Sequence, residues 1–536
     1  MKNVAAFVVL GLALLIPAVS HTQVNIWIDT TYGDHGKTEI NIGGFNNEIT
    51  GSYINRISPI TLCAKISTPT SGIYHFGMVR VDTNGKLDPG FGTGGIVNIS
   101  WNQNDYPTNM LLFGTSDTTF SYIFSGVSSS SALVNTWLPC LYRFKMNGIP
   151  DSSFGTNGRI QMPFADGSSG EADHVFQADT GYVICGTSRA ISENSGKTGF
   201  GVMRIDTNGH IHPAFGSGGR TVIPALVHSV NGFFLNDRHI FMCGVSDTGK
   251  HELLIGRCTE NGVPDSSVGV NGLIHTGIFI PGTGSSIRAA MRGDEKIMIL
   301  LSSPDSSPTP ITLCRFDPHG FLDSGYGING LGRNKIAPSI EVKGMNPSSD
   351  GSTFICGMSN IGLGESIFTR LNDTTAAPDP KYFLNGIALI DVDNGENRNY
   401  MQHLVPIGKL GINSPYKRYT GIGGSIHNGV EYLMISRFIT GPASSVRVNS
   451  ILQGNPLAIY PNPATSVFTI EVAIDAVKDI RIVDALGREI LRLSPQDYSQ
   501  DTKTFSANAA NLPNGVYYCI AQSGASQYVL KFVVAR

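Results

Sequence analysis

A short glycine-rich motif that returns along most of the chain is the feature that most limits its possible folds. Its first clear copy occupies residues 88–95 and has the pattern Asp-x-x-aromatic-Gly-x-x-Gly. Further copies lie at 151–158, 212–219, 265–272 and 323–330, with His212 in place of the aspartate in one and Val268 in place of the aromatic residue in another. Such copying indicates that one supersecondary unit is repeated, so the fold must be built from that unit.

An arginine on a short apolar stretch precedes each copy by eight residues, and an Asn-Gly or similar pair lies between them. Asn-Gly between strand-like runs predicts a hairpin, because both central residues of the favoured turn need a positive φ. We expect the motif's carboxylates to cap their own turns or to pair with these arginines. The residues given this structural role are Arg80, Asp88, Arg143, Asp151, Arg204, Arg257, Asp265, Arg315 and Asp323.

Two further arginines, Arg370 and Arg437, bring the number of such strands to seven. One inserted residue separates Arg370 from its Asp379, and no copy of the motif follows Arg437. The missing copy occurs at the other end of the chain, at residues 29–36, without an arginine strand before it. A ring explains this offset, because residues near Asp29 would complete the repeat that Arg437 begins and remove the exposed edge of an open array.

Each period has room for four short strands, which in the third unit are expected at 159–162, 174–177, 182–186 and 201–206. The 63 glycines and the low charged fraction, 15%, suit short strands joined by tight turns. The sequence therefore predicts an all-β fold in which residues 24–440 form a seven-bladed β-propeller closed by its N-terminal strand. An open β-solenoid is the alternative, but it gives no reason for the split repeat.

The runs 80–92 and 143–158 resemble the delta-60 repeat, a bacterial repeat with the form Arg, apolar, Asn/Asp-Gly, x, Leu-Asp-x-x-Phe-Gly-x-x-Gly. The resemblance covers about residues 24–440. It implies a propeller-like extracellular module and carries no settled activity.

The N-terminus has the pattern of a secretory signal. Lys2 precedes an apolar run over 4–16, and small residues at 18 and 20 fit a signal-peptidase site, so 1–20 is predicted to be a signal peptide. No later run approaches 18 consecutive apolar residues, so no membrane span is expected in the mature chain. The net charge of −3, without a basic run, gives no electrostatic reason to expect nucleic acid as a partner.

The eight cysteines are spread along the chain, and several stand at like positions in successive repeats. Examples are Cys63, Cys185, Cys243 and Cys356, each at the end of an apolar run. Repeated positions of this kind favour free buried thiols over a systematic disulfide framework.

After residue 440 the pattern changes to a polar linker, 441–455, and a unit of alternating strands, 456–536, for which an immunoglobulin-like β-sandwich is expected. Its landmarks, at 460–464, 484–488, 512–518 and 531–536, together resemble the type A sorting domain of the bacterial type IX secretion system. The sorting-motif residues are Pro461, Asn462, Pro463, Gly487, Leu512, Pro513, Gly515, Tyr517 and Lys531. The resemblance implies handling by that machinery, with passage through the periplasm and then surface attachment or release.

Motifs for chemistry are few. No Gly-x-Ser-x-Gly, His-Glu-x-x-His or Cys-x-x-Cys pattern occurs, so hydrolase and zinc functions have no positive support. The glycine patterns at 90–95 and 325–330 lack the βαβ context of a dinucleotide site and are assigned to turns. The scattered histidines, among them His174 and His403, are expected at the surface or in turns. No cofactor is predicted, with Ca²⁺ at Asp82, Asn84 and Asp88 kept as an alternative, although the spacing lacks a full acidic loop.

Function in a repeat scaffold is expected where the copies differ, in long loops. The largest insertion is placed at about 391–424, and a second irregular segment at 101–106 combines aromatic rings with amides, a composition that suits sugars. The candidate ligand residues are Trp101, Tyr106, Tyr416 and Arg418. The alternative is that these loops simply cover the ends of the ring.

These observations favour an exported cell-surface or secreted module that binds a glycan or protein, or serves a structural role. An enzyme acting on extracellular polysaccharide is the alternative, because fold does not decide function. An asymmetric acidic pair at the centre of the ring would favour the enzyme.

Overall fold

The computed structural model describes residues 24–54, 59–68, 73–102, 104–114, 120–130, 137–190, 198–249, 251–280, 286–302, 309–336, 340–348, 351–359, 365–382, 387–390, 392, 397–409, 417–442, 457–460, 462, 464–472, 477–484, 488–493, 498–499, 504–523 and 526–534. The chain divides into two compact units, Asn25–Gly441 and a second containing Pro442–Arg536. The predicted signal peptide, 1–20, lies outside the described residues. Within the described ranges no helix has the length and apolarity that crossing a membrane requires.

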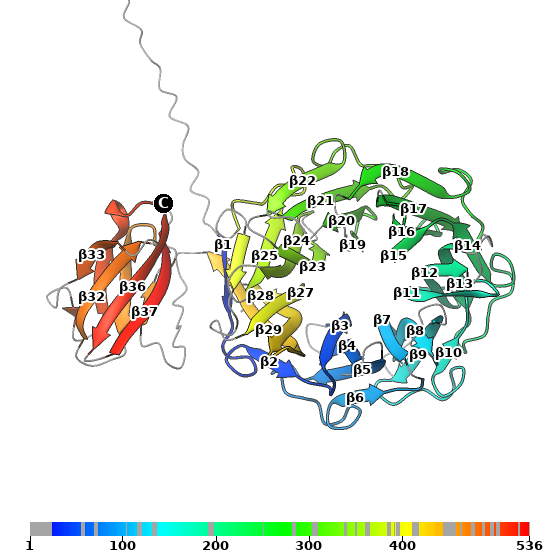
Figure 1. Cartoon of the computed structure of the whole chain (residues 1–536), viewed down its shortest axis with the longest axis horizontal. Coiled ribbons are helices and arrows are strands. Elements are labelled where there is room, and N and C mark those ends of the chain that lie inside the picture. Colours follow the sequence, from blue (N-terminus) through cyan, green and yellow to red (C-terminus); the bar gives the residue numbers. More distant parts are fainter. Residues whose placement is uncertain are drawn as a thin grey trace, which may run out of the picture. The chain divides into compact units, whose positions relative to one another are not determined.

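The larger unit consists of antiparallel strand groups that follow one another around a ring (Figure 1). The first two groups are joined into one eight-stranded sheet by a single parallel pair, Tyr74 with Asn104. Their strands are β3 (Asn46–Tyr53), β4 (Ile60–Ser67), β5 (Tyr74–Val81) and β6 (Ile96–Ile99), then β7 (Asn104–Phe113), β8 (Ser121–Ser129), β9 (Leu138–Lys145) and β10 (Arg159–Gln161).

Four further groups of four strands continue the ring in chain order. The third and fourth contain β11 (Ser168–Ala178), β12 (Gly181–Ala190), β13 (Gly199–Ile205) and β14 (Arg220–Pro224), then β15 (Val227–Phe234), β16 (His239–Ser246), β17 (Glu252–Thr259) and β18 (Leu273–Phe279). The fifth and sixth contain β19 (Ser286–Met291), β20 (Ile297–Ser302), β21 (Thr309–Phe316) and β22 (Leu331–Ile336), then β23 (Ile340–Pro347), β24 (Thr353–Ser359), β25 (Ser366–Leu371) and β26 (Ile387–Ile390).

The last group combines strands from both ends of the unit. Two N-terminal strands, β1 and β2, pair with its third strand, β29. The backbone N–H of Asp29 donates to the carbonyl of Arg437 at 2.7 Å, and the N–H of Arg437 donates to the carbonyl of Gly36 at 3.0 Å. The N-terminal copy of the motif thus completes the sheet that holds Arg437, as the split repeat predicts. The strands are β1 (Val24–Ile28), β2 (Lys37–Ile40), β27 (Arg398–Lys409), β28 (Lys417–His427) and β29 (Val430–Pro442).

Hydrophobic cores form between neighbouring strand groups, because a sheet must bury its apolar face against another element. One such core joins the beginning and the end of the unit. It packs Tyr32, Ile40 and Ile42 from the N-terminal segment with Ile422 and Leu433 from β28 and β29. The first and last groups therefore share buried side chains as well as backbone hydrogen bonds.

The repeated motif folds as a turn held by its own arginine. In the first copy, Asp88 accepts a hydrogen bond from the backbone N–H of Gly90 at 2.9 Å and another from Nε of Arg80 at 2.8 Å. The guanidinium of Arg80 also lies 4.6 Å from the centre of the Phe91 ring. Turn capping and the arginine pair were alternatives for the carboxylate, and the structure shows both. The same arrangement holds Asp151 with Arg143 and Asp323 with Arg315, each pair at 2.8 Å.

In five of its copies the motif also fastens one strand group to the next. The N–H of Gly92 donates to the carbonyl of Asn147 in the following hairpin turn at 2.8 Å, and Arg80 donates to the carbonyl of Met146. We call this set of contacts, made by the arginine, the carboxylate, the ring and the glycine, the clamp. Equivalent glycine bonds run from Gly155 to Asn208, from Gly216 to Asn261, from Gly327 to Thr374, and from Gly33 of the N-terminal copy to Asn84.

Two copies of the clamp depart from the pattern. Arg204, whose partner position holds His212, donates instead to the Thr180 hydroxyl at 3.4 Å. Arg257 lacks an aromatic ring at its partner position, Val268, and its guanidinium pairs with Asp265 and with Asp237, the latter at 2.5 Å. A copy of the clamp can therefore lack either the aspartate or the aromatic ring while it keeps the other.

Three expected elements differ from the structure. The stretch at 159–162 forms β10, which pairs with β9 and so ends the second group instead of starting the third. The supposed insertion at 391–424 is occupied largely by the long strands β27 and β28, and the irregular segment at 101–106 runs into β7 from Asn104 onward. The alternation of apolar and polar residues that marks a strand is weak in these segments, because both faces of the strand are covered or because bulges interrupt the two-residue period.

All eight cysteines are free and buried, as the repeated positions predict. Burial raises the pKa of Cys63, Cys258, Cys314 and Cys519 to about 12, so these thiols stay protonated and act as small core residues.

The smaller unit is a sandwich of two four-stranded antiparallel sheets around one core that includes Phe468, Ile480, Cys519 and Phe532. One sheet contains β30 (Leu457–Tyr460), β31 (Val467–Val472), β34 (Tyr498–Ser499) and β35 (Thr504–Asn508). The other contains β32 (Val477–Asp484), β33 (Glu489–Leu493), β36 (Gly515–Ser523) and β37 (Ser526–Val534), and the short 3-10 helix η3 (Ala509–Asn511) precedes β36.

The clamp predicts that replacing a clamp arginine destabilises the protein much more than replacing an exposed arginine. Arg143 is 9% exposed, so Arg143→Met leaves the Asp151 carboxylate without its cation and should lower the free energy of unfolding by about 3 kcal/mol. The side chain of Arg238 is 56% exposed, and Arg238→Met, which also removes an arginine pair, should change stability little. Urea unfolding of both variants measures this, and equal stability would show that the clamp is dispensable.

The same contact should depend on pH. Desolvation opposes ionisation of Asp151, but bonds from Ser153 and the charge of Arg143 outweigh it and lower the pKa of the carboxyl. A lowered folded pKa gives stability that is present above the unfolded pKa and is lost as pH falls through the folded one. The gap in melting temperature between the wild-type chain and Arg143→Met should therefore narrow in acid.

Candidate functional site

The first strand of each group lies nearest the centre of the ring, and we call these seven strands, β3, β7, β11, β15, β19, β23 and β27, the inner strands (Figure 1). Most of them carry a β-bulge at a corresponding place. The extra residue is Thr50 in β3, Thr108 in β7 and Asp173 in β11. It is Lys343 in β23 and Gln402 in β27, while β15 has two extra residues and β19 pairs without a shift. Bulges redirect side chains and are frequent beside functional sites.

Glycine on the second strand makes these bulges possible. A Cβ at Gly186 would lie 1.9 Å from the carbonyl oxygen of Glu171, and one at Gly423 would lie 1.8 Å from that of Tyr400. Any side chain there would collide with the backbone of the bulged inner strand. At Gly186 and Gly357 this glycine directly follows a buried cysteine, so the Cys-Gly pair is a sequence signal of the bulge in these two groups.

A cavity of about 360 Å³ opens among four inner strands, β3, β7, β23 and β27. Its walls carry hydroxyl, amide and imidazole groups together with a few apolar side chains, and none of its lining residues is charged. The lining residues are Thr50, Gly51, Ser52, Tyr53, Ile54, Asn109, Met110, Asn346, His403 and Val405.

His403 is the titratable lining group with a displaced pKa. Desolvation by the surrounding protein, reinforced by the charge of Arg288, lowers the pKa of its imidazole to about 4. The ring is therefore neutral at ordinary pH and offers one donor and one acceptor. His403 stands on an inner strand, so its expected place at the surface or in a turn is wrong. The same holds for His174 in β11, whose Nε2 lies 3.3 Å from Oδ1 of Asn231.

Charged groups stand on neighbouring parts of the same inner strands. Lys343 pairs with Glu341 at 2.6 Å, and the hydroxyl of Tyr400 donates to Glu431. On β11, burial and the nearby charge of Glu171 raise the pKa of Asp173 well above its usual value. The raised pKa favours the protonated form of the Asp173 carboxyl.

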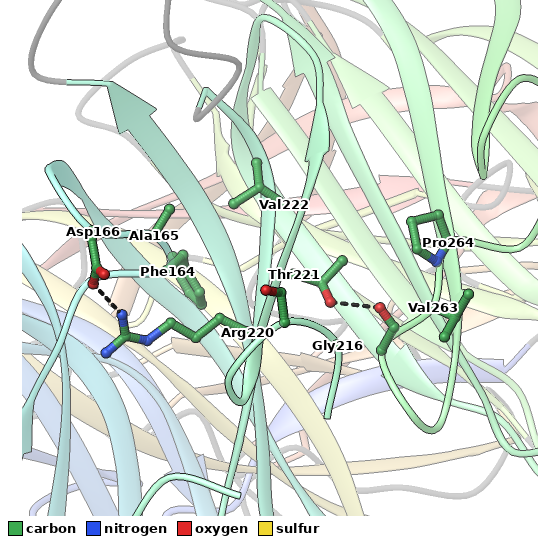
Figure 2. A pocket seen from close by; sticks show the side chains of 11 residues that line it. Phe164, Ala165, Asp166, Gly216, Arg220, Thr221, Val222, Val263 and Pro264 are labelled. Atoms are coloured by element: carbon green, nitrogen blue, oxygen red, sulfur yellow. Dashed lines mark hydrogen bonds and ion pairs between the residues drawn. The ribbon is translucent and has the colours of Figure 1, made fainter. Parts of the chain in front are cut away.

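A second, larger cavity of about 540 Å³ lies on the outer side of the ring, between β14 and the hairpin turn at 262–264 (Figure 2). Arg220 pairs with Asp166 across it at 2.6 Å, and the Thr221 hydroxyl donates to the carbonyl of Gly262 at 2.5 Å. These polar groups bond to each other or to the next strand group, so the cavity is the groove that a clamp leaves between two groups.

One histidine cluster resembles a catalytic triad in composition only. Ser425 Oγ lies 2.7 Å and Glu39 Oε1 lies 3.0 Å from the same nitrogen, Nε2 of His427. A triad needs the nucleophile and the acid on opposite nitrogens of the ring. Ser425 is also fully buried, so the cluster fastens β2 to β28 instead.

The predicted ligand residues occupy packed positions. The Trp101 ring stacks on Tyr142, with centroids 5.1 Å apart, and Tyr106 is buried with Nζ of Lys65 lying 4.3 Å from its ring centre. Arg418 pairs with Asp29 of the N-terminal motif at 3.3 Å, and Tyr416 lies outside the described residues. The structure does not bring Trp101, Tyr106 and Arg418 together, and the ligand role of all four residues stays a prediction.

The sorting-motif residues hold the sandwich together at its ends. The Asn462 side chain accepts a hydrogen bond from the N–H of Val533 in the last strand at 2.9 Å. Leu512 is buried, and the Tyr517 hydroxyl donates to the carbonyl of Pro513 at 2.8 Å. Gly515 begins β36, and the backbone of Lys531 pairs with that of Tyr518. Pro461, Pro463 and Gly487 lie outside the described residues.

In the described part of the chain, no three His, Cys, Asp or Glu side chains gather as metal ligands would. At the position considered for Ca²⁺, both carboxylate oxygens of Asp88 accept hydrogen bonds, one from Nε of Arg80 and one from the backbone N–H of Gly90.

Comparison with known families identifies the smaller unit. Residues 458–535 match the family model of the secretion system C-terminal sorting domain. The match covers the four landmarks quoted above up to residue 535 and indicates that the chain is exported by the type IX machinery to the cell surface or beyond. A search of curated protein sequences gives no match.

Among solved structures, the chain is similar to PorZ, an essential surface component of the type IX secretion system of Porphyromonas gingivalis, with a TM-score of 0.38 and 13% identity over 92% of this chain. It spans 60% of the length of PorZ. A protein of unknown function from Dyadobacter fermentans aligns over 77% of this chain and 98% of its own, with 7% identity and a TM-score of 0.37. An ulvan lyase aligns over 74% and 96%, also with 7% identity and a TM-score of 0.37.

The environment of His403 gives a direct prediction. Because desolvation and Arg288 both disfavour its charged form, the imidazole should titrate near pH 4, well below the usual value for histidine. Nuclear magnetic resonance of histidine-labelled protein, with His403→Asn to assign the signal, would measure it. A titration of His403 above pH 6 would contradict the placement of its ring in the cavity wall.

Proposed function

We propose that this chain is an exported binding module, delivered by its C-terminal sorting domain to the cell surface or released from it. The sorting-domain match over residues 458–535 supports the export step. In this proposal the N-terminal segment 1–20 directs the chain to the periplasm, and the sorting domain then directs it through the outer membrane.

We further propose that residues 24–440 form a seven-bladed β-propeller of delta-60-type repeats, closed by the N-terminal strands. The pairing of β1 and β2 with β29 supports closure, as does the core shared by Tyr32, Ile40 and Ile422. The clamp is also present at this junction. The backbone N–H of Gly33 in the N-terminal motif donates to the carbonyl of Asn84 in the first group, as the glycines of other copies donate to the hairpin turn of the following group. Closure removes the edge that an open array would expose.

The observation that carries the binding function is the contrast between the clamp and the inner strands. At the outer end the clamp residues repeat from copy to copy, as expected of residues that build the fold. On the inner strands the bulge positions differ, with Thr50, Asp173, Lys343 and Gln402 at corresponding places. A repeat scaffold that varies where its strands converge is suited to recognise a ligand there.

A polysaccharide-acting enzyme is the second candidate, and the pair Glu171 and Asp173 favours it. Burial and the charge of Glu171 raise the pKa of Asp173, and a carboxyl held protonated in this way can serve as the general acid of glycosidic cleavage. Release of shorter oligosaccharides from a bound glycan would decide for this candidate over a pure binding module.

The export step predicts the fate of a truncated chain. A chain that ends at residue 455, expressed in a bacterium with the type IX machinery, should accumulate in the periplasm because the machinery lacks its signal. Cell fractionation and protease shaving of intact cells measure the location. An unrelated reporter fused to residues 456–536 is the matched control and should be exported. Surface display of the truncated chain would rule out the sorting role.

Closure predicts the effect of removing the N-terminal strands. Deleting residues 24–44 exposes the edge of β29 and removes the buried side chains Tyr32, Ile40 and Ile42, so the free energy of unfolding should fall by roughly 5 kcal/mol. A chain that lacks only residues 1–23 is the control. Thermal unfolding of the two proteins compares them, and equal melting temperatures would mean that the ring does not depend on its N-terminal strands.

A further inference from the structure

The cavity among the inner strands combines strands that are distant in sequence. β3 and β7 come from the first half of the larger unit, and β23 and β27 from its end. No single repeat contains the site, so it exists only when the first two and last two groups stand side by side. This distinguishes it from the outer groove of Figure 2, which lies between two consecutive groups and is crossed by their own polar bonds.

The polar groups on its wall are hydrogen-bonding but uncharged. Thr50 and Ser52 present hydroxyls, Asn109 and Asn346 present amides, and His403 presents a neutral imidazole. The amide oxygen of Asn346 also accepts a hydrogen bond from the backbone N–H of Leu404 at 3.2 Å, so its NH2 group is the part left for a ligand. Amides and the imidazole each offer both donors and acceptors, and hydroxyls do the same. Such a set complements a ligand rich in hydroxyl groups, which also donate and accept.

Arg288 and Lys343, two cations on neighbouring strands, do not line the cavity, and both bond to other groups. Arg288 on β19 donates through Nε to the carbonyl of Lys343 at 2.9 Å and through Nη1 to that of Ile287 at 2.9 Å. Lys343 is paired with Glu341. An anionic ligand would have to be desolvated in the cavity without a lining cation, which is costly. The geometry therefore disfavours uronic acids, sulfated sugars and phosphates.

The volume of the cavity and its apolar lining residues limit the possible ligands further. A volume of about 360 Å³ is at the small end of ligand pockets, which run from roughly 300 to 1,000 Å³. Ile54, Met110 and Val405 give the cavity an apolar side on which the C–H face of a sugar ring can pack. We propose that this cavity binds one or two units of an uncharged saccharide, with Asn109, Asn346 and His403 as its hydrogen-bonding contacts. The inference rests on the proposed role of the chain as an exported binding module.

Two variants test the site, and a third is a matched control. Asn109→Ala removes an amide from the wall, and Ser52→Trp fills the space. Asn231 follows the bulge of β15 as Asn109 follows that of β7, but it does not line the cavity, so Asn231→Ala is the control. All three are made in the full chain, and unchanged thermal unfolding shows that each is folded.

The probe is an array of neutral and acidic oligosaccharides, followed by calorimetry with the best neutral ligand. We expect neutral saccharides to bind, Asn109→Ala to weaken binding at least tenfold, Ser52→Trp to abolish it, and Asn231→Ala to leave it unchanged. Binding by acidic sugars alone, or no binding by any saccharide, overturns the ligand class. Saccharide binding that survives both cavity variants overturns the location but leaves the binding module standing. Surface display of the truncated chain would overturn the export step alone, because that experiment does not involve the cavity.

Discussion

The larger unit depends on an arginine whose charge is buried and shared between two strand groups. Taking a guanidinium out of water is costly unless a carboxylate and hydrogen-bond acceptors replace the water. Arg143 finds Asp151 and the Phe154 ring within its own group, and the carbonyl of Thr207 in the next. Because one side chain is satisfied only when both groups are in place, the fold of one repeat and its attachment to the next are the same event. The attachment lies at the outer end of each group, which leaves the inner strands free to vary.

Much of this architecture could be predicted from the sequence, because the residues that build each copy are repeated with it. The offset between Arg80 and Asp88 returns four times, and a contact required in every copy leaves that kind of periodic record. The displaced copy at Asp29 even indicated which strands share the last sheet. The sorting domain was recognisable for a related reason, since its landmarks fix the ends of the sandwich, where Asn462 binds the last strand.

The candidate site could not be predicted in the same way. Asn109 and His403 line one cavity although they stand on β7 and β27, and no pattern within a repeat relates them. The bulges that direct these side chains depend on hydrogen-bond register, which a one-residue change alters without changing composition. Composition alone did not indicate that Trp101 packs inside the unit, because an aromatic and amide-rich segment has the same composition whether its ring meets a sugar or stacks on Tyr142.

The shared sheet at the two ends of the larger unit bears on when the protein can reach its native state. The side chain of Asn47 donates to the carbonyl of Glu431, 384 residues away, and Arg437 donates to the carbonyl of Thr83. Local hairpins can form as the chain emerges, but these bonds must wait until nearly the whole unit has been made. Contacts of such long sequence separation slow folding, because the entropy of closing the loop is lost before they form. Throughout synthesis, therefore, the edge of the first group and the core around Ile40 remain without their partners, and a chaperone that covers them would act at that stage.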